Sequence, residues 1–494
     1  EDFELGAMVG HSFLKTRSRT SYIDAQNYPS PAFDVASVAA NIVDASAGLS
    51  EYAIESYFAR LSLAYKDRYV VNATIRTDGS SRFAPDCRWG WFPSVSVGWN
   101  VSNESFWNAE KTDLKIRASY GRTGNQDGIS NYGWQALISG GVNYGGQSGI
   151  AISSSGNDRL TWETADQYNA GFDLSFLGGK INMIADVYLK NTNNLLYSKP
   201  VHATTGETSI LSNIGSMRNK GVEFTINTHL NLGKVLWSSS FNIARNVNKL
   251  TSLLEDDLLS IGANRALKLG RTVGSWYIFR TDGIYQYDGE VPQALYDKGV
   301  RAGDVKYWDR NGDGNITDDD RIVTGNPNPK FSGGWNNTFK YKGLELSLFF
   351  TYSYGNDVYA SWMIPGSKPG HTRSLLKAYA DNRWTGPGTS DKYPRAIYSY
   401  SGWNGKNSTM YLTDGSFIRL RSVTLGYTFP QRLVSKIHLK GLRVYAQGDN
   451  VFLCSRYPGW DPETSVNLDP RFYGEDNDGV PQPRIFKLGV NITF

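Results

Sequence analysis

The stretch 484-RIFKLGVNITF-494 decides the fold class of this chain, because its residues alternate strictly between apolar and polar or small. Successive side chains of a β-strand point to opposite faces, so this alternation predicts a strand with one oily face and one polar face. Such a strand, ending on an aromatic residue, is typical of the closing strand of an outer-membrane β-barrel. We expect its oily face to serve as the barrel assembly signal, and that face comprises Phe486, Leu488, Val490, Ile492 and Phe494.

The same two-residue period recurs along the chain. About fourteen segments show it, among them residues 69–78, 89–102, 168–176, 344–353 and 422–429. This pattern predicts an all-β fold, namely a transmembrane antiparallel β-barrel. In each strand the alternate residues that are apolar, here called the apolar parity, would face lipid. The residues between them, the polar parity, would line a water-filled lumen. A soluble sheet with one buried face would alternate in the same way.

The lengths of the connections favour the barrel over the soluble sheet. Very short turns are expected at residues 66–68, 177–180, 232–234 and 341–343. Between those hairpins lie long polar segments at residues 20–50, 122–159, 251–329 and 354–415. Short turns on one side and long extracellular loops on the other are typical of bacterial barrels. Aromatic residues near the short turns fit a ring of side chains at the membrane interface.

Composition excludes several other classes of protein. Only 40% of the 494 residues are hydrophobic, and no stretch approaches the ~20 apolar residues of a membrane-spanning helix. The net charge of +4 is small and scattered, so nucleic-acid binding is not expected. Cys87 and Cys454 can be paired or free. Isolated histidines and adjacent loop acids such as Glu475 and Asp476 give no catalytic arrangement, so we do not expect an enzyme.

Several motifs spread over the chain resemble one family, the SusC/RagA-type TonB-dependent transporters. They are 76-RTDGSSRF-83, 91-WFPSVSVGW-99, 114-LKIRASYGRTGN-125, 213-NIGSMRNKGVE-223, 325-GNPNP-329 and 341-YKGL-344. The resemblance implies a 22-stranded barrel in the outer membrane of a Gram-negative bacterium that imports large nutrients with energy passed on by TonB. It also implies a SusD-like surface lipoprotein that acts as a lid. An oligosaccharide or glycan is the first expectation for the substrate, and an oligopeptide the second.

The chain departs from the family pattern at its start. An N-terminal extension, a TonB-binding segment and a plug precede the barrel in that family, whereas residues 1–10 are already strand-like here. We therefore expect residues 1–494 to be the C-terminal part of such a barrel. Its partners would then be the remaining N-terminal strands and plug, the TonB complex acting through that N-terminal part, and outer-membrane lipid.

A motif in the longest loop, residues 251–329, predicts a calcium site. The stretch 309-DRNGDGNITDDD-320 matches a twelve-residue EF-hand loop with a glycine at position six. Asp309, Asn311 and Asp313 hold positions one, three and five, Asn315 offers its carbonyl at seven, and Asp320 replaces the usual Glu at twelve. The expectation is one bound Ca²⁺. The alternative is a turn stabilised only by hydrogen bonds from Asx side chains to the backbone.

Aromatic residues in the long loops are candidates for substrate binding, because flat rings among polar groups suit stacking on sugars or contact with peptides. The alternative is that these rings pack the loops against themselves. The candidates are Trp276, Tyr277, Tyr285, Trp308, Trp362, Trp403, Tyr411 and Trp460.

Three functions from different classes fit these patterns. The first is an energised importer, and the second is a passive outer-membrane pore. The third is a loop-bearing surface binding protein or adhesin. A plug and a TonB-binding segment upstream of Glu1 in the gene would favour the importer.

Overall fold

The computed structural model describes residues 2–108, 112–202, 204, 207, 209–253, 257–366, 374–397 and 402–494. Strands dominate these residues, which confirms the all-β prediction. The helices in the described ranges are all short, and none of them has the length and hydropathy needed to cross a membrane.

The largest sheet has fourteen strands, as the alternation predicts, and the paired neighbours with a determined register run antiparallel. Its members in hydrogen-bonded order are β1 (Phe3–Gln26), β2 (Asn41–Tyr65), β3 (Tyr69–Ser80), β4 (Trp89–Asn100), β5 (Thr112–Asn125), β8 (Glu163–Phe176), β9 (Ile181–Asn193), β12 (Gly215–Leu232), β13 (Val235–Leu253), β20 (Phe331–Tyr341), β21 (Leu344–Tyr354), β24 (Phe417–Thr428), β25 (Gly441–Ser455) and β27 (Ile485–Thr493).

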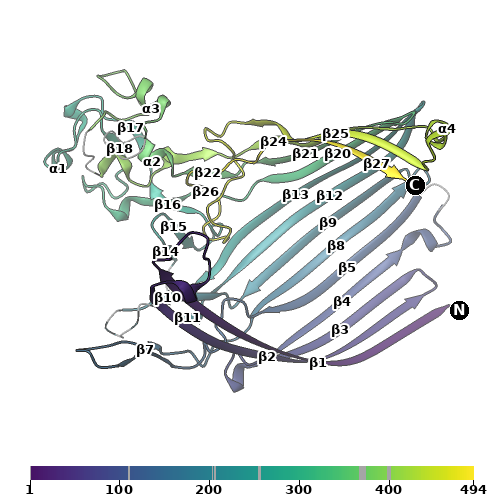
Figure 1. Cartoon of the computed structure of the whole chain (residues 1–494), viewed down its shortest axis with the longest axis horizontal. Helices are drawn as coiled ribbons and strands as arrows, with labels where there is room; N and C mark the ends of the chain where they lie inside the picture. The colour runs from purple at the N-terminus through teal and green to yellow at the C-terminus, as the bar shows by residue number, and fades with distance from the viewer. Residues whose placement is uncertain are drawn as a thin grey trace. The chain divides into compact units, whose positions relative to one another are not determined.

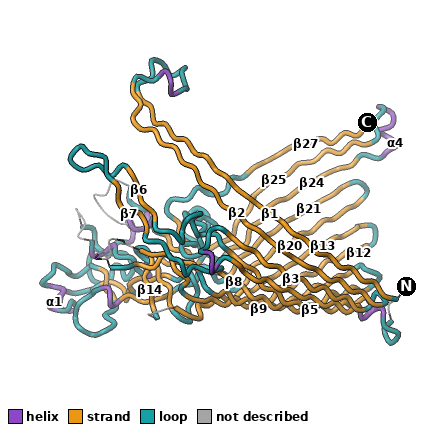
Figure 2. Tube along the Cα trace, turned by 90° about the horizontal axis from the view of Figure 1, so that it is seen from below, coloured by secondary structure: helices purple, strands orange, loops and turns teal. Residues whose placement is uncertain are grey.

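The chain divides into two compact units. Unit 1 comprises Glu1–Glu104, Ile116–Ala170 and Lys190–Met217, and unit 2 comprises Ser105–Lys115, Gly171–Leu189 and Arg218–Phe494. In unit 1 the β1–β2 hairpin is longer than its neighbour, because the β2–β3 ladder ends at Ile54 and β2 continues back to Asn41 against β1. Figure 2 shows this hairpin projecting past β3 and ending in a short helical turn. The expected loop at residues 20–50 is therefore largely strand.

The connections between the strands of unit 1 contain two small sheets and an aromatic cluster. The small sheets are β6 (Leu137–Gly140) with β7 (Ile150–Ser154), and β10 (Leu196–Pro200) with β11 (Ser209–Asn213). Trp162 lies 5.0 Å from the ring of Phe83 and 5.4 Å from that of Phe92. Its indole Nε1 donates to the Arg88 carbonyl at 3.0 Å, so the buried ring has no unpaired polar atom.

Unit 2 confirms the short turns. Between β20 and β21 the chain reverses through Lys342 and Gly343, both with positive φ. A side chain at Gly343 would meet the Thr428 carbonyl oxygen at 2.4 Å, so both the conformation and the close approach require glycine. Between β24 and β25 the connection contains α4 (Gln431–Val434) instead.

The long loops of unit 2 are not irregular, which sequence alone did not predict. They contain β14 (Leu258–Ile261), β15 (Arg265–Lys268), β16 (Trp276–Phe279), β17 (Thr281–Ile284), β18 (Val305–Tyr307), β19 (Arg321–Thr324), β22 (Asp357–Ala360), β23 (Leu412–Asp414) and β26 (Glu475–Asp476). Short helices α1 (Gln293–Tyr296), α2 (Met363–Gly366) and α3 (Lys377–Asn382) accompany them (Figure 1). Among the described residues, the 3-10 turns with determined bounds are η1 (Ala36–Val38), η2 (Pro85–Cys87), η3 (Val101–Asn103), η5 (Asp288–Glu290), η6 (Asp318–Asp320), η7 (Trp403–Gly405), η8 (Thr409–Tyr411) and η9 (Ser435–Ile437).

Apolar residues of the parity predicted to face lipid are exposed. In β27, Phe486 is 75% exposed and Leu488 90%, as expected for side chains that face lipid. On the other face Gly489 lies under the ring of Tyr445, where an added Cβ would come within 2.3 Å of the ring. One end of the predicted pattern was wrong: β4 stops at Asn100, and Val101 begins a 3-10 turn and is buried.

Candidate functional site

The polar face of unit 1 carries a regular array of hydroxyl and amide groups, because strand register aligns the polar parity of neighbouring strands. Thr74 of β3 pairs with Arg60 of β2 on one side and with Ser94 of β4 on the other. One step along the strands, Asn72 pairs with Ser62 and with Ser96. These rows lie on the face that the alternation assigns to the lumen.

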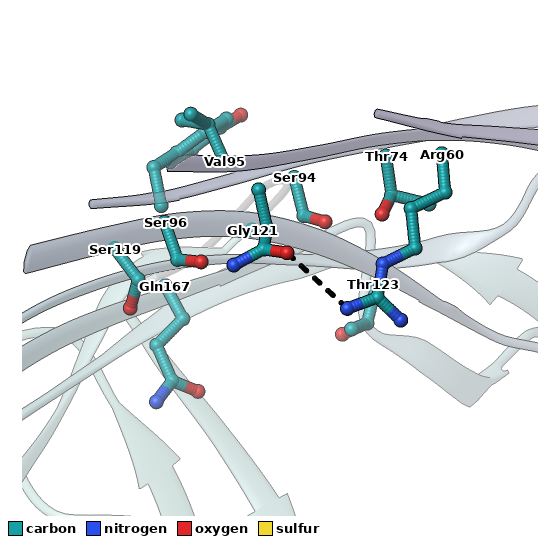
Figure 3. Close-up of a pocket in the computed structure, with 11 residues that line it drawn as sticks. Arg60, Thr74, Ser94, Val95, Ser96, Ser119, Gly121, Thr123 and Gln167 are labelled. Carbon is teal, nitrogen blue, oxygen red and sulfur yellow. Dashed lines mark hydrogen bonds between the residues drawn. The ribbon is translucent and has the colours of Figure 1, made fainter. Parts of the chain in front are cut away.

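A cavity of about 420 Å³ lies on this face (Figure 3). Figure 3 shows Arg60 and Gln167 reaching into the same space as the serines, whereas Val95 points to the other side of the strands. None of the lining residues is acidic. They are Arg60, Asn72, Thr74, Ser94, Val95, Ser96, Ser119, Tyr120, Gly121, Thr123 and Gln167.

Side-chain size explains why the wall is hollow at this place. Small residues occupy its middle, and the missing side chain of Gly121 leaves room beside Ser94, whose Cβ lies 3.5 Å from where a Gly121 Cβ would stand. The longer side chains of Arg60 and Gln167 stand at its ends (Figure 3). Arg60 donates to the Asn72 side-chain oxygen at 3.3 Å, and Ser62 donates to the same oxygen at 2.8 Å. The result is a wet pocket rich in groups that can both donate and accept hydrogen bonds.

A second cavity, of about 480 Å³, lies in unit 2 where β20 begins and β21 ends. Charged side chains of both signs line it, and the 325-GNPNP-329 motif contributes its first two residues. Two hydrogen bonds between Asp357 and Asn326 fix its wall. The Asp357 amide donates to the Asn326 carbonyl at 2.8 Å, and the Asn326 amide donates to the Asp357 carboxylate at 2.8 Å. The lining residues are Arg271, Gly325, Asn326, Lys330, Tyr354, Gly355, Asn356, Asp357, Asp414 and Ser416.

Burial perturbs the carboxyl group in this second cavity. It raises the pKa of Asp357 above its ordinary value, because the charged form loses water there, and the nearby Asp414 acts in the same direction. The amide of Asn326 and the charge of Lys330 oppose the shift without cancelling it.

A buried arginine joins two of the loops of unit 2. Arg265 is fully buried and stacks on Trp276, with its guanidinium carbon 4.1 Å from the ring centre. Its guanidinium donates to the carbonyls of Gly274, Phe472 (3.2 Å) and Tyr473 (3.0 Å). Burial lowers the pKa of Arg265 to about 10, which leaves it cationic at neutral pH. The segment between β25 and β27 is thereby held against the loop that carries β15.

A second arginine holds the same segment at β24. Arg419 is buried and binds Asp461 at 2.5 Å and Glu463 at 2.7 Å. Arg421 shares Glu463 at 2.7 Å, and the amide of Gln482 donates to Asp461 at 3.1 Å. Two arginines of one barrel strand therefore hold Asp461 and Glu463, and Asp461 in turn holds Gln482 at the other end of the segment 456–484.

The structure separates the eight aromatic candidates into two groups. Trp276, Tyr285 and Tyr411 are at most 3% exposed and belong to the hydrophobic clusters of the loops. Burial raises the pKa values of Tyr285 and Tyr411. For these three residues the burial supports the alternative in which the rings pack the loops, and a ring without exposed surface cannot stack on a ligand in this state.

The other five candidates keep some exposed surface. Trp362 donates to the Tyr457 hydroxyl at 3.0 Å, and Trp403 donates to the Val305 carbonyl at 2.9 Å, so each is partly tied to the loop core. Tyr277 and Trp308 are half-buried beside Arg321 and Arg280, respectively. Trp460 is 81% exposed. Substrate contact by these five residues stays a prediction.

The predicted calcium loop forms a tightly hydrogen-bonded turn. The Asp309 carboxylate accepts from the amides of Gly312 (2.7 Å) and Gly314 (2.8 Å). Asp320 is fully buried and accepts from the amides of Arg310 (2.9 Å) and Thr317 (2.7 Å). These bonds use the carboxylates as Asx-type acceptors.

The side chains of the predicted calcium ligands also contact one another and a lysine. Within the described ranges no group of three or more His, Cys, Asp or Glu side chains is close enough to hold a metal ion. Asn311 instead donates to Asp313 at 3.0 Å, and the Asn315 side chain accepts from Lys298 at 2.7 Å. Asp309, Asn311, Asp313, Asn315 and Asp320 thus take part in a hydrogen-bonded turn, and calcium binding by these residues stays a prediction.

Sequence reasoning missed the residues that make the two cavities. The polar parity marked Ser94 as lumenal, but only the register of β2, β3 and β4 shows which polar side chains adjoin it there. It also missed Arg265 and Arg419. Isolated arginines in a loop and a strand carry no signal, because the partners that make them cross-links are distant: Phe472 lies 207 residues from Arg265, and Asp461 lies 42 residues from Arg419.

Comparison with known proteins agrees with this architecture. The family described as TonB dependent receptor-like, beta-barrel matches residues 2–451, and the chain belongs to that family. Its members lie in the outer membrane of Gram-negative bacteria, so the exposed apolar strand faces described above lie against outer-membrane lipid. The resemblance to SusC/RagA-type receptors is confirmed.

Two relatives and one structure illustrate the similarity. The chain is 30% identical to TonB-dependent receptor P3 of Formosa agariphila over 99% of this chain and 50% of that protein. It is 31% identical to TonB-dependent receptor SusC of Bacteroides thetaiotaomicron over 89% of this chain and 43% of that protein. The RagAB peptide transporter matches in fold, with a TM-score of 0.86 at 23% identity over 100% of this chain and 54% of that one. The chain thus spans about half the length of the curated relatives it matches.

Proposed function

We propose that this chain forms part of the barrel of an energised outer-membrane importer of large nutrients, with an oligosaccharide or glycan as its substrate. The observation that carries the proposal is the two-faced strand: apolar side chains are exposed on one parity, and a polar hollow lies on the other. Such a wall suits passage of a hydrophilic solute. An adhesin would need the exposed loops but not a polar hollow in the wall.

The chemistry of the wall favours sugars over peptides. The cavity in unit 1 presents hydroxyl and amide groups from Asn72, Thr74, Ser94 and Ser119 in a space without carboxylates. Groups that both donate and accept match the hydroxyls of a sugar ring, which do the same. A peptide-selective wall would need apolar pockets for side chains as well. The oligopeptide is therefore the second candidate.

Three partners belong to this proposal. A SusD-like surface lipoprotein would act as a lid over the extracellular loops. The TonB complex would supply energy through an N-terminal part, and the remaining barrel strands and a plug would complete the transporter. The organised loops of unit 2, with their own buried cores, offer a lid a defined surface.

Uptake measurements in the native bacterium test the proposal. A strain that lacks the gene should lose growth on the cognate polysaccharide, and a strain that lacks TonB should lose it as well. Loss in the first strain but not in the second would mean a passive pore. Surface binding of labelled oligosaccharide without uptake in the wild type would mean an adhesin.

A further inference from the structure

We propose that the short-turn end of unit 2 binds the headgroups of anionic phospholipids. The surface, here called the basic rim, consists of the cationic side chains in four connections of the fourteen-stranded sheet, at residues 177–180, 233–234, 342–343 and 429–440. Its members are Lys180, Lys234, Lys342, Arg432, Lys436 and Lys440. The inference adds a lipid ligand to the outer-membrane location and does not depend on which substrate the transporter imports.

Sheet topology brings the four connections to one end of unit 2. The amide of His229 in β12 donates to the carbonyl of Lys180 at 2.7 Å, which places the β8–β9 turn beside the end of β12. Leu236 of β13 pairs with Lys340 of β20, and β21 begins at Leu344 beside the end of β24. Figure 1 shows α4 at the end of the sheet opposite to β16 and β17. Neighbouring hairpins are about 10 Å apart, because each spans two strand spacings.

The charge of the basic rim has one sign. Its four connections contain six Lys or Arg and no Asp or Glu, whereas the whole chain is nearly balanced, with 51 Lys and Arg against 47 Asp and Glu. Charges in water at physiological ionic strength act over ~8 Å, close to the hairpin spacing, so the cations reinforce one another. Each Lys or Arg near an anionic membrane surface strengthens binding about fivefold. Several such cations favour an anionic lipid over a zwitterionic one.

The basic rim continues the surface that faces lipid. Tyr341 pairs with Leu344 across the β20–β21 turn, so both side chains belong to the apolar parity, and Tyr341 is 39% exposed. The ammonium of Lys342 lies 5.4 Å from the centre of the Tyr341 ring. A tyrosine at this level suits the headgroup region, and a lysine beside it can reach the phosphates while its stem stays on apolar surface. The charge of Lys342 is thus on the lipid side of the strand end.

The connection that contains α4 combines the same two kinds of side chain. Val434 is buried and holds the helix against the barrel. Leu433 and Ile437 are 53% and 59% exposed, and the exposed cations Arg432 and Lys436 stand next to them in the chain. Large apolar side chains with adjacent cations suit the boundary between hydrocarbon and anionic headgroups.

The rest of the proposed transporter would leave this surface open to lipid. A plug would lie inside the lumen, and further strands would join the sheet at β1 and β27, so neither would cover the outer side of these connections. The short turns of bacterial barrels are periplasmic. The lipid is therefore a phospholipid of the periplasmic leaflet rather than lipopolysaccharide.

Lipid binding by the purified full-length transporter tests the basic rim. The probes are phosphatidylglycerol, which is anionic, and phosphatidylcholine with the same acyl chains, which is zwitterionic. Native mass spectrometry in a neutral detergent measures both affinities. The wild type should bind phosphatidylglycerol more tightly, and the triple variant Lys234→Gln, Lys342→Gln, Lys436→Gln should weaken that lipid about tenfold or more while it leaves phosphatidylcholine nearly unchanged. A high concentration of ammonium acetate should reduce the preference in the wild type.

Two further triple variants make the result specific. The variant Lys306→Gln, Lys377→Gln, Lys392→Gln removes the same charge from exposed lysines in the long loops of unit 2 and should change neither affinity. Arginine in place of the three rim lysines keeps the charge and should keep the preference. Heat-modifiable migration on gels would confirm that each variant still forms a barrel.

The outcomes decide the proposal without reference to the substrate. If the wild type binds the two lipids equally, or if the rim triple variant keeps the preference for phosphatidylglycerol, the lipid site is wrong. If the loop triple variant loses the preference to the same extent, net charge and not the basic rim attracts the lipid, and the proposal fails as well. Loss of the preference in the arginine variant would contradict the charge argument. Oligosaccharide uptake tests the importer proposal separately.

Discussion

At the scale of single residues, buried arginines organise the loops of this protein. Arg265 donates to three carbonyls from two loop segments and stacks on Trp276, so one side chain cross-links the two segments. Desolvation of its charge is offset by these hydrogen bonds and by the nearby charge of Glu475.

Replacing Arg265 should loosen the segment between β25 and β27. Arg265→Met leaves three carbonyl oxygens without their donor, and we expect a local cost of about 2 kcal/mol or more. Hydrogen exchange of residues 469–475 should become faster. Arg271→Met is the matched control, since its side chain is exposed. Unchanged exchange in Arg265→Met would mean that the aromatic packing alone holds the segment.

Metal content tests the loop at residues 309–320. If the loop binds Ca²⁺, metal analysis of the purified protein should show one ion that disappears in the double variant Asp309→Ala, Asp313→Ala. The same calcium content in wild type and double variant would assign these residues to the hydrogen-bonded turn alone. Asp297→Ala, an exposed acid in the same loop region, serves as the control.

At the scale of elements, the parity of each strand decides which substitutions the membrane tolerates. Val97 of β4 is 46% exposed on the apolar face, and Ser96 beside it lies on the polar face. Val97→Arg should destabilise the barrel by about 2 kcal/mol, because it places a charge against lipid, whereas Ser96→Arg should be mild in the wet lumen. An outer-membrane assembly assay compares the two. Equal tolerance would contradict the parity assignment.

The stability of the small sheet that contains β22 should depend on pH, because Asp357 titrates there. Burial raises the pKa of Asp357, so protonation favours the folded sheet. This stabilising contribution is complete below the ordinary carboxyl pKa of 3.8 and is lost as pH rises through the raised value. Protection factors for amide exchange of residues 355–360, which correct for the pH dependence of free amides, should therefore be higher at acidic than at alkaline pH, and Asp357→Asn should remove most of the difference. Protection factors that keep their pH dependence in Asp357→Asn would contradict this assignment.

At the scale of the whole molecule, the two edges of the fourteen-stranded sheet decide whether residues 1–494 can form a closed barrel alone. In the strand order β1 and β27 each have one hydrogen-bonded neighbour. Unpaired edges in hydrocarbon cost several kcal/mol for each backbone group, so a stable barrel needs these edges covered. Residues 1–494 expressed alone should give no heat-modifiable band, whereas the full gene product should. A heat-modifiable band from residues 1–494 alone would show that β1 and β27 pair with each other.

The sequence by itself determined the fold class, the number of strands and which face of each strand meets lipid. It could do so because a period of two is a local property. The residues next to Val97 or Leu488 in the chain already indicate which face of the sheet each side chain lies on. The short turns, such as that at Gly343, were equally local.

Only the tertiary structure decided where function can lie. The hollow between Arg60 and Gln167 depends on the register of β2, β3 and β4, and the burial of Trp276, Tyr285 and Tyr411 depends on loop sheets built from segments far apart in sequence. Both properties arise from contacts between distant residues. A single sequence holds no local pattern for such contacts, because the free energy that selects them comes from packing between strands and loops rather than from the period of any one strand.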